Sequence, residues 1–330
     1  MKAITYDRFG SAADVLKPAE VVCPDPAAGE VLVKLVYSGV NPSDVKSRAG
    51  GRPGVTKPAF DQIIPHSDGA GEVIAVGAGV DAARIGQRVW IWNGQWQRPF
   101  GTAASHITLP AQQAVPLPDA VSFETGASLG IPGLTACHAV FGGGDVAGET
   151  VLVQGGAGTV GLLAVQLAKW GGARVIATCS PKDMDAVRAA GADHVIDYRA
   201  DDLPAQVLAA NDGAFVETIV EVEFGINIAM DTEVIAPNGR IAAYGAAKEL
   251  SPTLPFYPLL FKAVTIDIIL IYLLPPAERD QTITRLHNAL AEGALDCPVA
   301  KIYPLAETAR AHEAVEAAVR SGAILIDCQS

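Results

Sequence analysis

A glycine-rich stretch at residues 156–161, Gly-Ala-Gly-Thr-Val-Gly, has the G-x-G-x-x-G spacing of a loop that holds a pyrophosphate. It directly follows the apolar run 151–153 and precedes a segment with helical spacing. Gly156 permits a tight turn, Gly158 lets the backbone approach an anion, and Gly161 lets the helix pack closely on the strand. The N–H groups at the helix start attract negative charge. Because the loop lies between a strand and a helix, we predict dinucleotide binding here, with an ordinary strand-to-helix turn as the alternative.

The stretch that follows the next apolar run indicates which dinucleotide binds. An NAD site needs an acidic side chain there to bond the ribose 2′-hydroxyl, but no acid precedes Asp183. Ser180 can donate to a 2′-phosphate and Lys182 can neutralise it, whereas a carboxylate in that place would repel it. Tyr198 and Arg199 add a ring and a second cation. We therefore predict NADPH rather than NADH. The alternative is that Lys182 only begins a solvated helix.

Two regions of the chain with different secondary-structure patterns must position these residues. From about residue 121 onward, apolar strand patterns alternate with helical ones, which is typical of a parallel sheet covered by helices on both faces. Six such strands suit the doubly wound dinucleotide-binding fold of the α/β class; they lie at 151–153, 174–178, 194–197, 215–220, 240–244 and 264–272. Earlier in the chain, short strands separated by Gly and Pro predict a compact barrel-like domain; they lie at 31–37, 71–77 and 88–92.

The composition excludes several classes of function. Of 330 residues, 36 are acidic and 24 are basic, so a net charge of −12 argues against binding to nucleic acid or to anionic membranes. The longest apolar run, 268–274, is far shorter than the ~20 residues that span a bilayer. Half of the residues are apolar, which excludes a disordered chain. The five scattered cysteines form no C-x-x-C pair and the N-terminus has no apolar signal core, so we expect a soluble cytoplasmic protein.

Several motifs in the same chain together resemble one known family. They are GVNPSD at 39–44, DGAGEV at 68–73, LGIPGLTA at 129–136, QGGAGTVG at 154–161 and AGADHVI at 190–196. Their order and content resemble the zinc-independent quinone oxidoreductases, the zeta-crystallin-like branch of the medium-chain dehydrogenase/reductase superfamily. The resemblance implies a GroES-like β-rich catalytic domain at 1–120 and 273–330, a Rossmann NADP-binding domain at 121–272, and NADPH in the cleft between them. It also implies a homodimer that pairs through the strand at 264–272.

The residues that hold zinc in the alcohol dehydrogenases of this superfamily are replaced here. The resemblance places Asn41, Ser67-Asp68 and Ile131 where those enzymes carry a Cys, a His-Glu pair and another Cys. His66 stands one residue before the expected ligand, and a lone imidazole cannot hold zinc, which takes three or four protein ligands. The closely spaced cysteines of a structural zinc site are absent as well. We therefore predict that the protein binds no metal.

Without a metal, the resemblance implies hydride transfer to a quinone, which needs only to be aligned with the nicotinamide and shielded from water. Asn41 would bond the acceptor or the nicotinamide, Asp44 would orient Asn41 or a ribose hydroxyl, and Thr135 would contact the nicotinamide. Lys46 stands where the family has a tyrosine. It would bind an acidic acceptor, assist protonation or point to solvent.

The resemblance also assigns the cofactor contacts. The pyrophosphate side comprises Gly156, Gly158, Thr159, Val160 and Gly161; the 2′-phosphate and adenosine side Ser180, Lys182 and Tyr198; and the ribose and nicotinamide side Gly245, Ile269 and Ile271. Two other functions stay open at this point. One is an NADPH-dependent enal, enone or enoyl-thioester reductase, which shares the fold and the cofactor. The other is a low-turnover NADPH-binding structural or sensing protein.

Overall fold

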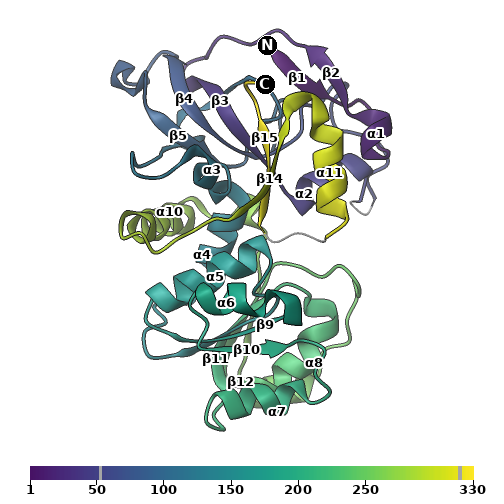
Figure 1. Ribbon diagram of the computed structural model, residues 1–330, viewed down its shortest axis with the longest axis vertical. Coiled ribbons are helices and arrows are strands. Elements are labelled where there is room, and N and C mark those ends of the chain that lie inside the picture. Colours follow the sequence, from purple (N-terminus) through teal and green to yellow (C-terminus); the bar gives the residue numbers. More distant parts are fainter. Residues whose placement is uncertain (52–53, 319–321) are drawn as a thin grey trace. The chain divides into compact units, whose positions relative to one another are not determined.

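The computed structural model describes residues 1–51, 54–318 and 322–330, which form two compact units. The first unit combines residues 1–131 with 297–330, and the second comprises 132–296 (Figure 1). The sequence predicts the boundaries at 121 and 273 instead. The segment after 273 joins the second unit because α10 (Pro276–Ala291) packs on α4 (Leu134–Phe141). There, Cys137 Sγ donates to the backbone oxygen of Thr282 at 3.5 Å.

The first unit is built around a seven-stranded sheet in the order β14-β15-β3-β4-β5-β7, with β6 also paired to β3. Its strands are β3 (Glu30–Val40), β4 (Asp68–Val76), β5 (Arg88–Ile91), β6 (His106–Pro110), β7 (Ala114–Pro116), β14 (Val299–Pro304) and β15 (Ala323–Asp327). All neighbours are antiparallel except β14 and β15. On β3, Val31, Val33 and Leu35 point inward at every second position and are fully buried. This unit confirms the predicted GroES-like β-rich domain.

Short elements surround this sheet. Strands β1 (Lys2–Thr5) and β2 (Lys17–Glu20) pair separately, and the helices are α1 (Ala12–Val15), α2 (Pro42–Ala49), α3 (Phe123–Gly126) and α11 (Thr308–Glu316). Helix α2 begins directly after β3, with Asn41 as its N-cap and Pro42 in its first turn. It ends at Gly50, whose φ of 79° is the left-handed conformation of a helix stop. These local signals place Asn41 and Asp44 at the end of a central strand.

The second unit is a six-stranded sheet in which every neighbouring pair is parallel. The order is β10-β9-β8-β11-β12-β13, with bounds β8 (Thr150–Val153), β9 (Arg174–Cys179), β10 (His194–Asp197), β11 (Val216–Glu221), β12 (Ile235–Ala243) and β13 (Thr265–Ile268). The helices between them are α5 (Thr159–Trp170), α6 (Met184–Ala189), α7 (Leu203–Ala210), α8 (Phe224–Val234) and α9 (Phe256–Phe261). Right-handed crossovers place α5 and α6 on one face and α7 and α8 on the other (Figure 1). The doubly wound Rossmann prediction is confirmed.

The sixth strand is shorter than the sequence predicts. The apolar run 264–272 predicts one long strand, but β13 spans only Thr265–Ile268 and a 3₁₀ turn follows at Ile271–Leu273. The ladder stops because its partner β12 ends at Ala243, which pairs with Ile268. Ile269 N then donates to Ala243 O at 2.8 Å and the chain turns away. In the described part of the chain, the helices include none that is both long and apolar enough to cross a membrane.

Candidate active site

The phosphate loop in the second unit connects β8 to α5. Gly158 is the N-cap of α5, so the first N–H groups of this helix receive no side-chain cap. Gly158 is exposed and Thr159 and Val160 are half-buried, which leaves that end of the helix open to a ligand. A Cβ on Gly161 would lie 2.2 Å from Gly155 O, so only glycine permits this packing. Uncapped donors at a helix start fit a pyrophosphate.

The groups predicted to bind the 2′-phosphate lie after β9 and β10. Ser180 Oγ donates to Asp183 Oδ2 at 2.6 Å, and Lys182 is exposed. Tyr198 is half exposed, and the Arg199 guanidinium lies 5.3 Å from the centre of its ring. The sequence shows no acid before Asp183, but the Asp183 carboxylate itself accepts a hydrogen bond from Ser180. NADPH specificity therefore stays a prediction whose test must include Asp183.

The remaining predicted cofactor contacts lie after β12 and β13 and on α4. Gly245 packs so closely that a Cβ would lie 2.3 Å from Val222 O. Ile269 and Ile271 are buried rather than presented along an extended strand, because β13 ends before them. Thr135 is also buried, in the first turn of α4. The roles of these residues stay predictions.

A cluster of buried polar groups in the first unit contains two of the predicted catalytic residues. Asn41 Nδ2 donates to Asp68 Oδ2 at 2.7 Å, and Ile131 N donates to the same oxygen at 3.0 Å. Asn41 N donates to Asp44 Oδ2 at 2.8 Å. Two of the positions at which zinc enzymes of the resembled superfamily carry ligands, Asn41 and Ile131, thus meet here on Asp68, the residue that follows the third position, Ser67.

Burial controls the protonation of this cluster. It raises the pKa of Asp44 to about 7, although hydrogen bonds from Asn41 and from the Ser67 backbone act in the opposite direction. Burial also raises the pKa of Asp68 well above its usual range, and the negative charge of Asp44 raises it further. In the described residues, His, Cys, Asp and Glu form no group of three that could hold a metal ion. What the cluster offers a ligand is hydrogen-bonding and proton-holding chemistry.

His66 makes its contacts away from this cluster. Its Nδ1 lies 2.9 Å from Ser38 Oγ, and its Nε2 lies 2.9 Å from Nε2 of His312 on α11. Thr102 Oγ1 donates to Asp68 O at 2.6 Å, so the hydrogen between Ser38 and Thr102 must come from Ser38. His66 Nδ1 then donates to Ser38 and its Nε2 accepts from His312. Burial lowers the pKa of His66 to about 3, which keeps this ring neutral.

A pocket of ≈ 310 Å³ opens beside helix α2 in the first unit. Its described lining is largely aromatic and apolar, with Tyr6, Phe9, Phe60 and Trp96 around Ser47 and Gly50 of α2 and its end. Lys46, on the same helix, is exposed. Of the tryptophans in this part of the chain, Trp96 lines the pocket, whereas Trp90 is fully buried in the sheet.

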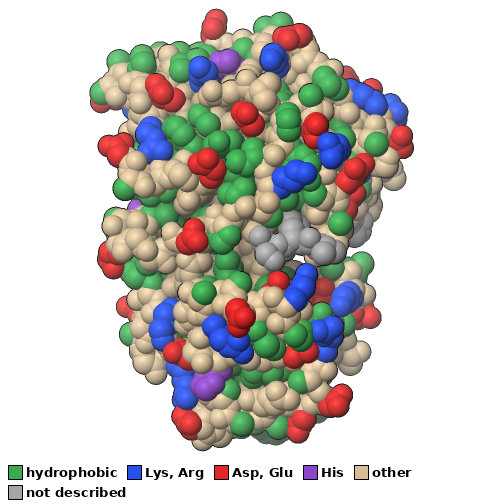
Figure 2. Space-filling model, in the orientation of Figure 1, with side chains coloured by type: hydrophobic (Ala, Val, Ile, Leu, Met, Phe, Trp, Pro, Cys, Tyr) green, Lys and Arg blue, Asp and Glu red, His purple; other side chains and the backbone are tan. Residues whose placement is uncertain are grey.

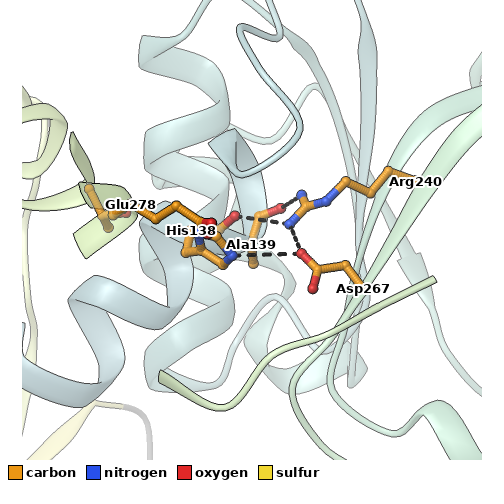
Figure 3. A network of polar contacts seen from close by, with 6 residues as sticks. His138, Ala139, Arg240, Asp267 and Glu278 are labelled. Atoms are coloured by element: carbon orange, nitrogen blue, oxygen red, sulfur yellow. Dashed lines mark hydrogen bonds and ion pairs between the residues drawn. The ribbon is translucent and has the colours of Figure 1, made fainter. Parts of the chain in front are cut away.

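Two polar networks in the second unit escape sequence reasoning. In one, Arg240 of β12 donates to the carbonyl oxygens of His138 and Ala139 near the end of α4 and to Asp267 Oδ2 (Figure 3). In the other, the carboxyl groups of Glu221 and Asp231 are fully buried and lie close together, and Asp231 accepts from Gln154 Nε2. The only sequence signal is a charged residue inside an apolar strand or helix, which does not identify its partner.

Comparison with known proteins agrees with this architecture. A family model described as "Alcohol dehydrogenase GroES-like domain" matches residues 27–119, and one described as "Zinc-binding dehydrogenase" matches residues 159–288. The quinone oxidoreductase of Rattus norvegicus is 30% identical over 95% of this chain and 93% of its own length. A polyketide synthase subunit of Mycobacterium tuberculosis is 29% identical over 95% of this chain and 14% of its own length. The crystal structure of Escherichia coli quinone oxidoreductase complexed with NADPH has a TM-score of 0.85 at 27% identity, and the match covers 99% of this chain and 100% of that chain.

Proposed function

Because the chain belongs to the medium-chain dehydrogenase/reductase superfamily, whose members use NAD(P)H, we propose that it is a zinc-independent reductase that passes a hydride from NADPH to a quinone. The observation that carries this proposal is the full-length similarity to quinone oxidoreductases, joined to uncapped helix donors at the phosphate loop. An NADPH-bound structural relative supports the choice of cofactor.

The aromatic pocket is consistent with binding of a flat ring such as that of a quinone, and its described lining comes from the Gly50 end of α2 rather than from Asn41. Its ≈ 310 Å³ is at the lower end of the range for small-molecule sites, and flat rings such as those of Phe60 and Trp96 stack on a planar acceptor. On the face drawn in Figure 2, basic and acidic side chains are interspersed with apolar ones, and the described residues there form no continuous basic surface. We take a small, uncharged, planar molecule as the substrate.

The residues of this chain have separate tasks in the proposed reaction. NADPH, when bound, supplies the hydride. Asn41 is held by Asp68 at Nδ2, and its amide would bond a carbonyl oxygen of the acceptor. Asp44 fixes the backbone of Asn41, and Thr135 contacts the nicotinamide. The reduced oxygen takes its proton from solvent, with exposed Lys46 available to deliver it.

The first test is NADPH oxidation by the purified protein with benzoquinone, with crotonyl thioester offered in parallel and NADH replacing NADPH in a second pair. Quinone-dependent oxidation with NADPH preferred supports the proposal. Oxidation with the thioester alone supports the alternative of an enoyl-thioester reductase, which the similarity to a polyketide synthase subunit favours. In that case Lys46→Ala raises KM for the thioester. Binding of NADPH without turnover of any acceptor, enals and enones included, indicates a sensing or structural role.

A homodimer through the edge of the Rossmann sheet forms part of the proposal. Among the described residues, strand β13 pairs with β12 alone, which leaves its other edge of the six-stranded sheet open. Large apolar side chains are exposed on β13 and on the preceding helix; they are Phe256, Tyr257, Leu260, Phe261 and Ile268. Such an edge promotes association unless it is covered. A second copy of the chain would cover it by continuing the sheet.

The dimer is tested by sedimentation of the purified protein. We expect the natural chain to sediment as a dimer and Ile268→Glu to sediment as a monomer that still binds NADPH. Val22→Glu, at another exposed apolar residue, serves as the matched control and should stay dimeric. A monomeric natural chain contradicts the proposal.

We also place the protein in the cytoplasm. No disulfide joins any of the five cysteines, and three of the four buried ones have raised thiol pKa values because they are buried. Buried, inert thiols that form no disulfide are usual in a reducing compartment. Fractionation of the producing cells tests this placement.

A further inference from the structure

A chain of buried hydrogen bonds lies beneath the phosphate loop of the second unit. Gln154 directly follows β8, Thr178 lies near the end of β9, Glu221 ends β11, and Asp231 lies on α8. All four side chains are buried. Ends of parallel strands meet at one edge of a sheet, and ligands of doubly wound folds bind at that edge. These hydrogen bonds therefore lie where they can hold the loops of the dinucleotide site.

One end of the chain holds the phosphate loop. Gly155 N donates to Thr178 Oγ1 at 3.2 Å, and Thr178 Oγ1 donates to Gln154 Oε1 at 2.7 Å. With its oxygen fixed by Thr178, Gln154 donates through Nε2 to Asp231 Oδ1 at 3.1 Å. The position of Asp231 thus decides where Gln154 and the first turn of the phosphate loop lie.

The other end holds the loop after β12. Glu221 accepts from Asn227 Nδ2 at 3.1 and 3.2 Å and from Glu223 N. Glu223 Oε1 accepts in turn from the backbone N–H groups of Ala247 at 2.7 Å and Lys248 at 2.8 Å. Two loops that are far apart in the sequence are thereby tied to the same pair of carboxyl groups.

Two carboxyl groups, those of Glu221 and Asp231, lie close together at the centre of this network. Their side chains are within hydrogen-bonding reach, and a bond between two carboxyl groups needs a hydrogen on one of them. Asp231 Oδ2 is buried and accepts no hydrogen bond from an N–H or O–H group of the described residues, so it is the oxygen that is free to carry that hydrogen. Burial raises the pKa of both groups. The other titratable groups that act on the pair are Glu223 and Tyr244, neither of which is a cation.

We propose that the Glu221–Asp231 pair is a positioning element of the dinucleotide site, which aligns the phosphate loop with the loop at 245–248 as long as the pair keeps its shared proton. Loss of that proton leaves two adjacent buried negative charges that repel each other. The series of hydrogen bonds that runs from Gly155 to Lys248 then loosens, and NADPH binds more weakly at alkaline pH. This inference rests on the proposed function in one respect, namely that NADPH binds at the phosphate loop.

The test is the Kd of NADPH, measured by nicotinamide fluorescence from neutral to alkaline pH. Asp231→Asn keeps a donor toward Glu221 and an acceptor for Gln154 but cannot titrate. We expect it to bind NADPH as tightly as the natural protein at neutral pH and to lose the alkaline weakening. Asp201→Asn, at an exposed carboxylate of the same unit, is the matched control and should keep that weakening.

A second variant keeps the inference testable if substitutions of the buried pair impair folding. Glu223→Ala removes the acceptor for Ala247 and Lys248 at a half-buried position, and we expect about tenfold weaker NADPH binding with an unchanged Tm. Glu223→Gln keeps the acceptor and should restore the affinity. If the natural protein binds NADPH but Asp231→Asn keeps the same pH dependence, or Glu223→Ala binds normally, the inference is overturned. If the natural protein does not bind NADPH at all, the proposed function itself fails.

Discussion

Asn41 and Asp68 form a buried amide–carboxyl pair in which Nδ2 lies 2.7 Å from Oδ2. The same Asp68 oxygen accepts the N–H of Ile131, so one carboxyl group ties the end of β3 to the segment before α4. A buried donor or acceptor that loses its partner costs more free energy than the bond itself contributes. The pair therefore fixes the orientation of the Asn41 side chain.

Substitution of Asn41 tests this relationship. Asn41→Ala should lower the free energy of unfolding by about 2 kcal/mol, because it leaves a buried oxygen of Asp68 with one donor fewer. The same change should lower kcat with the quinone by about tenfold or more, since the acceptor loses a hydrogen-bond donor. Urea denaturation and steady-state kinetics measure the two effects. Lys46→Ala is the control for stability, because Lys46 is exposed, and should unfold like the natural protein. Full activity in Asn41→Ala would remove Asn41 from the proposed site.

The pH dependence of stability should report the buried Asp44. Its folded-state pKa of about 7 lies above the ordinary value of 3.8 because the carboxyl group is buried. A raised pKa means that its contribution to stability is complete below about pH 3.8 and is lost as the pH rises toward about 7. Asp44→Asn cannot titrate, so its free energy of unfolding should fall less over this window. Thermal unfolding at a series of pH values measures the difference, and identical slopes for both proteins would show that Asp44 ionises normally.

The buried pair of His66 and His312 should make the free energy of unfolding depend on pH in the opposite direction from Asp44. Burial lowers the pKa of His66 from 6.5 to about 3 and also lowers that of His312. Both rings therefore stabilise the fold above pH 6.5, and this contribution is lost as the pH falls toward about 3. His312→Asn should reduce the loss of stability on acidification, provided that the fold tolerates the substitution at neutral pH. His194→Asn is the control, at a half-buried histidine of the other unit, and should keep the acid sensitivity of the natural protein.

Arg240 should support the helix that carries Thr135. Its guanidinium donates to two carbonyl oxygens of α4 and to Asp267 Oδ2 at 2.5 Å (Figure 3). Arg240→Met keeps most of the apolar stem but removes the donor to Ala139 O and leaves His138 O with the N–H of Gly142, which should lower the free energy of unfolding by about 2–3 kcal/mol. Arg188→Met is the matched control, because that arginine pairs with exposed Asp185 on one surface helix and should contribute little. Chemical denaturation distinguishes the two variants, and equal midpoints would contradict the capping role.

Local signals made much of this protein predictable from its sequence. The run 151–153, the glycines at 156–161 and the helical spacing beyond them define β8, the loop and α5, because each signal acts within a few residues. The end of β13 was not predictable, since an apolar run does not tell where its partner strand stops. Glu221 and Asp231 meet only after β11 and α8 have packed, so the pairing of these two carboxyl groups leaves no mark on the sequence. The contact of Asn41 with Asp68 was not predictable either, because the two residues are distant in the sequence and meet only in the folded unit.

Asp183 should limit the preference of this protein for NADPH. The sequence separates it from Ser180 by two residues, yet its Oδ2 lies 2.6 Å from Ser180 Oγ, the group predicted to bind the 2′-phosphate. A carboxylate at this place repels a phosphate by about 1 kcal/mol at a solvated surface. Asp183→Asn should therefore lower KM for NADPH by about fivefold and leave KM for NADH unchanged. Steady-state kinetics with both dinucleotides and one quinone measure the effect.

Two further variants test whether Asp183 acts specifically on the 2′-phosphate of NADPH. Lys182→Ala removes the cation that would neutralise the phosphate, and should raise KM for NADPH alone by about tenfold. Asp185→Asn removes an almost fully exposed carboxylate two residues further on and should change neither KM. If Asp183→Asn shifts both dinucleotides equally, the carboxylate acts on the pyrophosphate or on the loop rather than on the 2′-phosphate. In that case Ser180 and Lys182 do not form the specificity site, because a group bonded directly to Ser180 would have to distinguish the two cofactors.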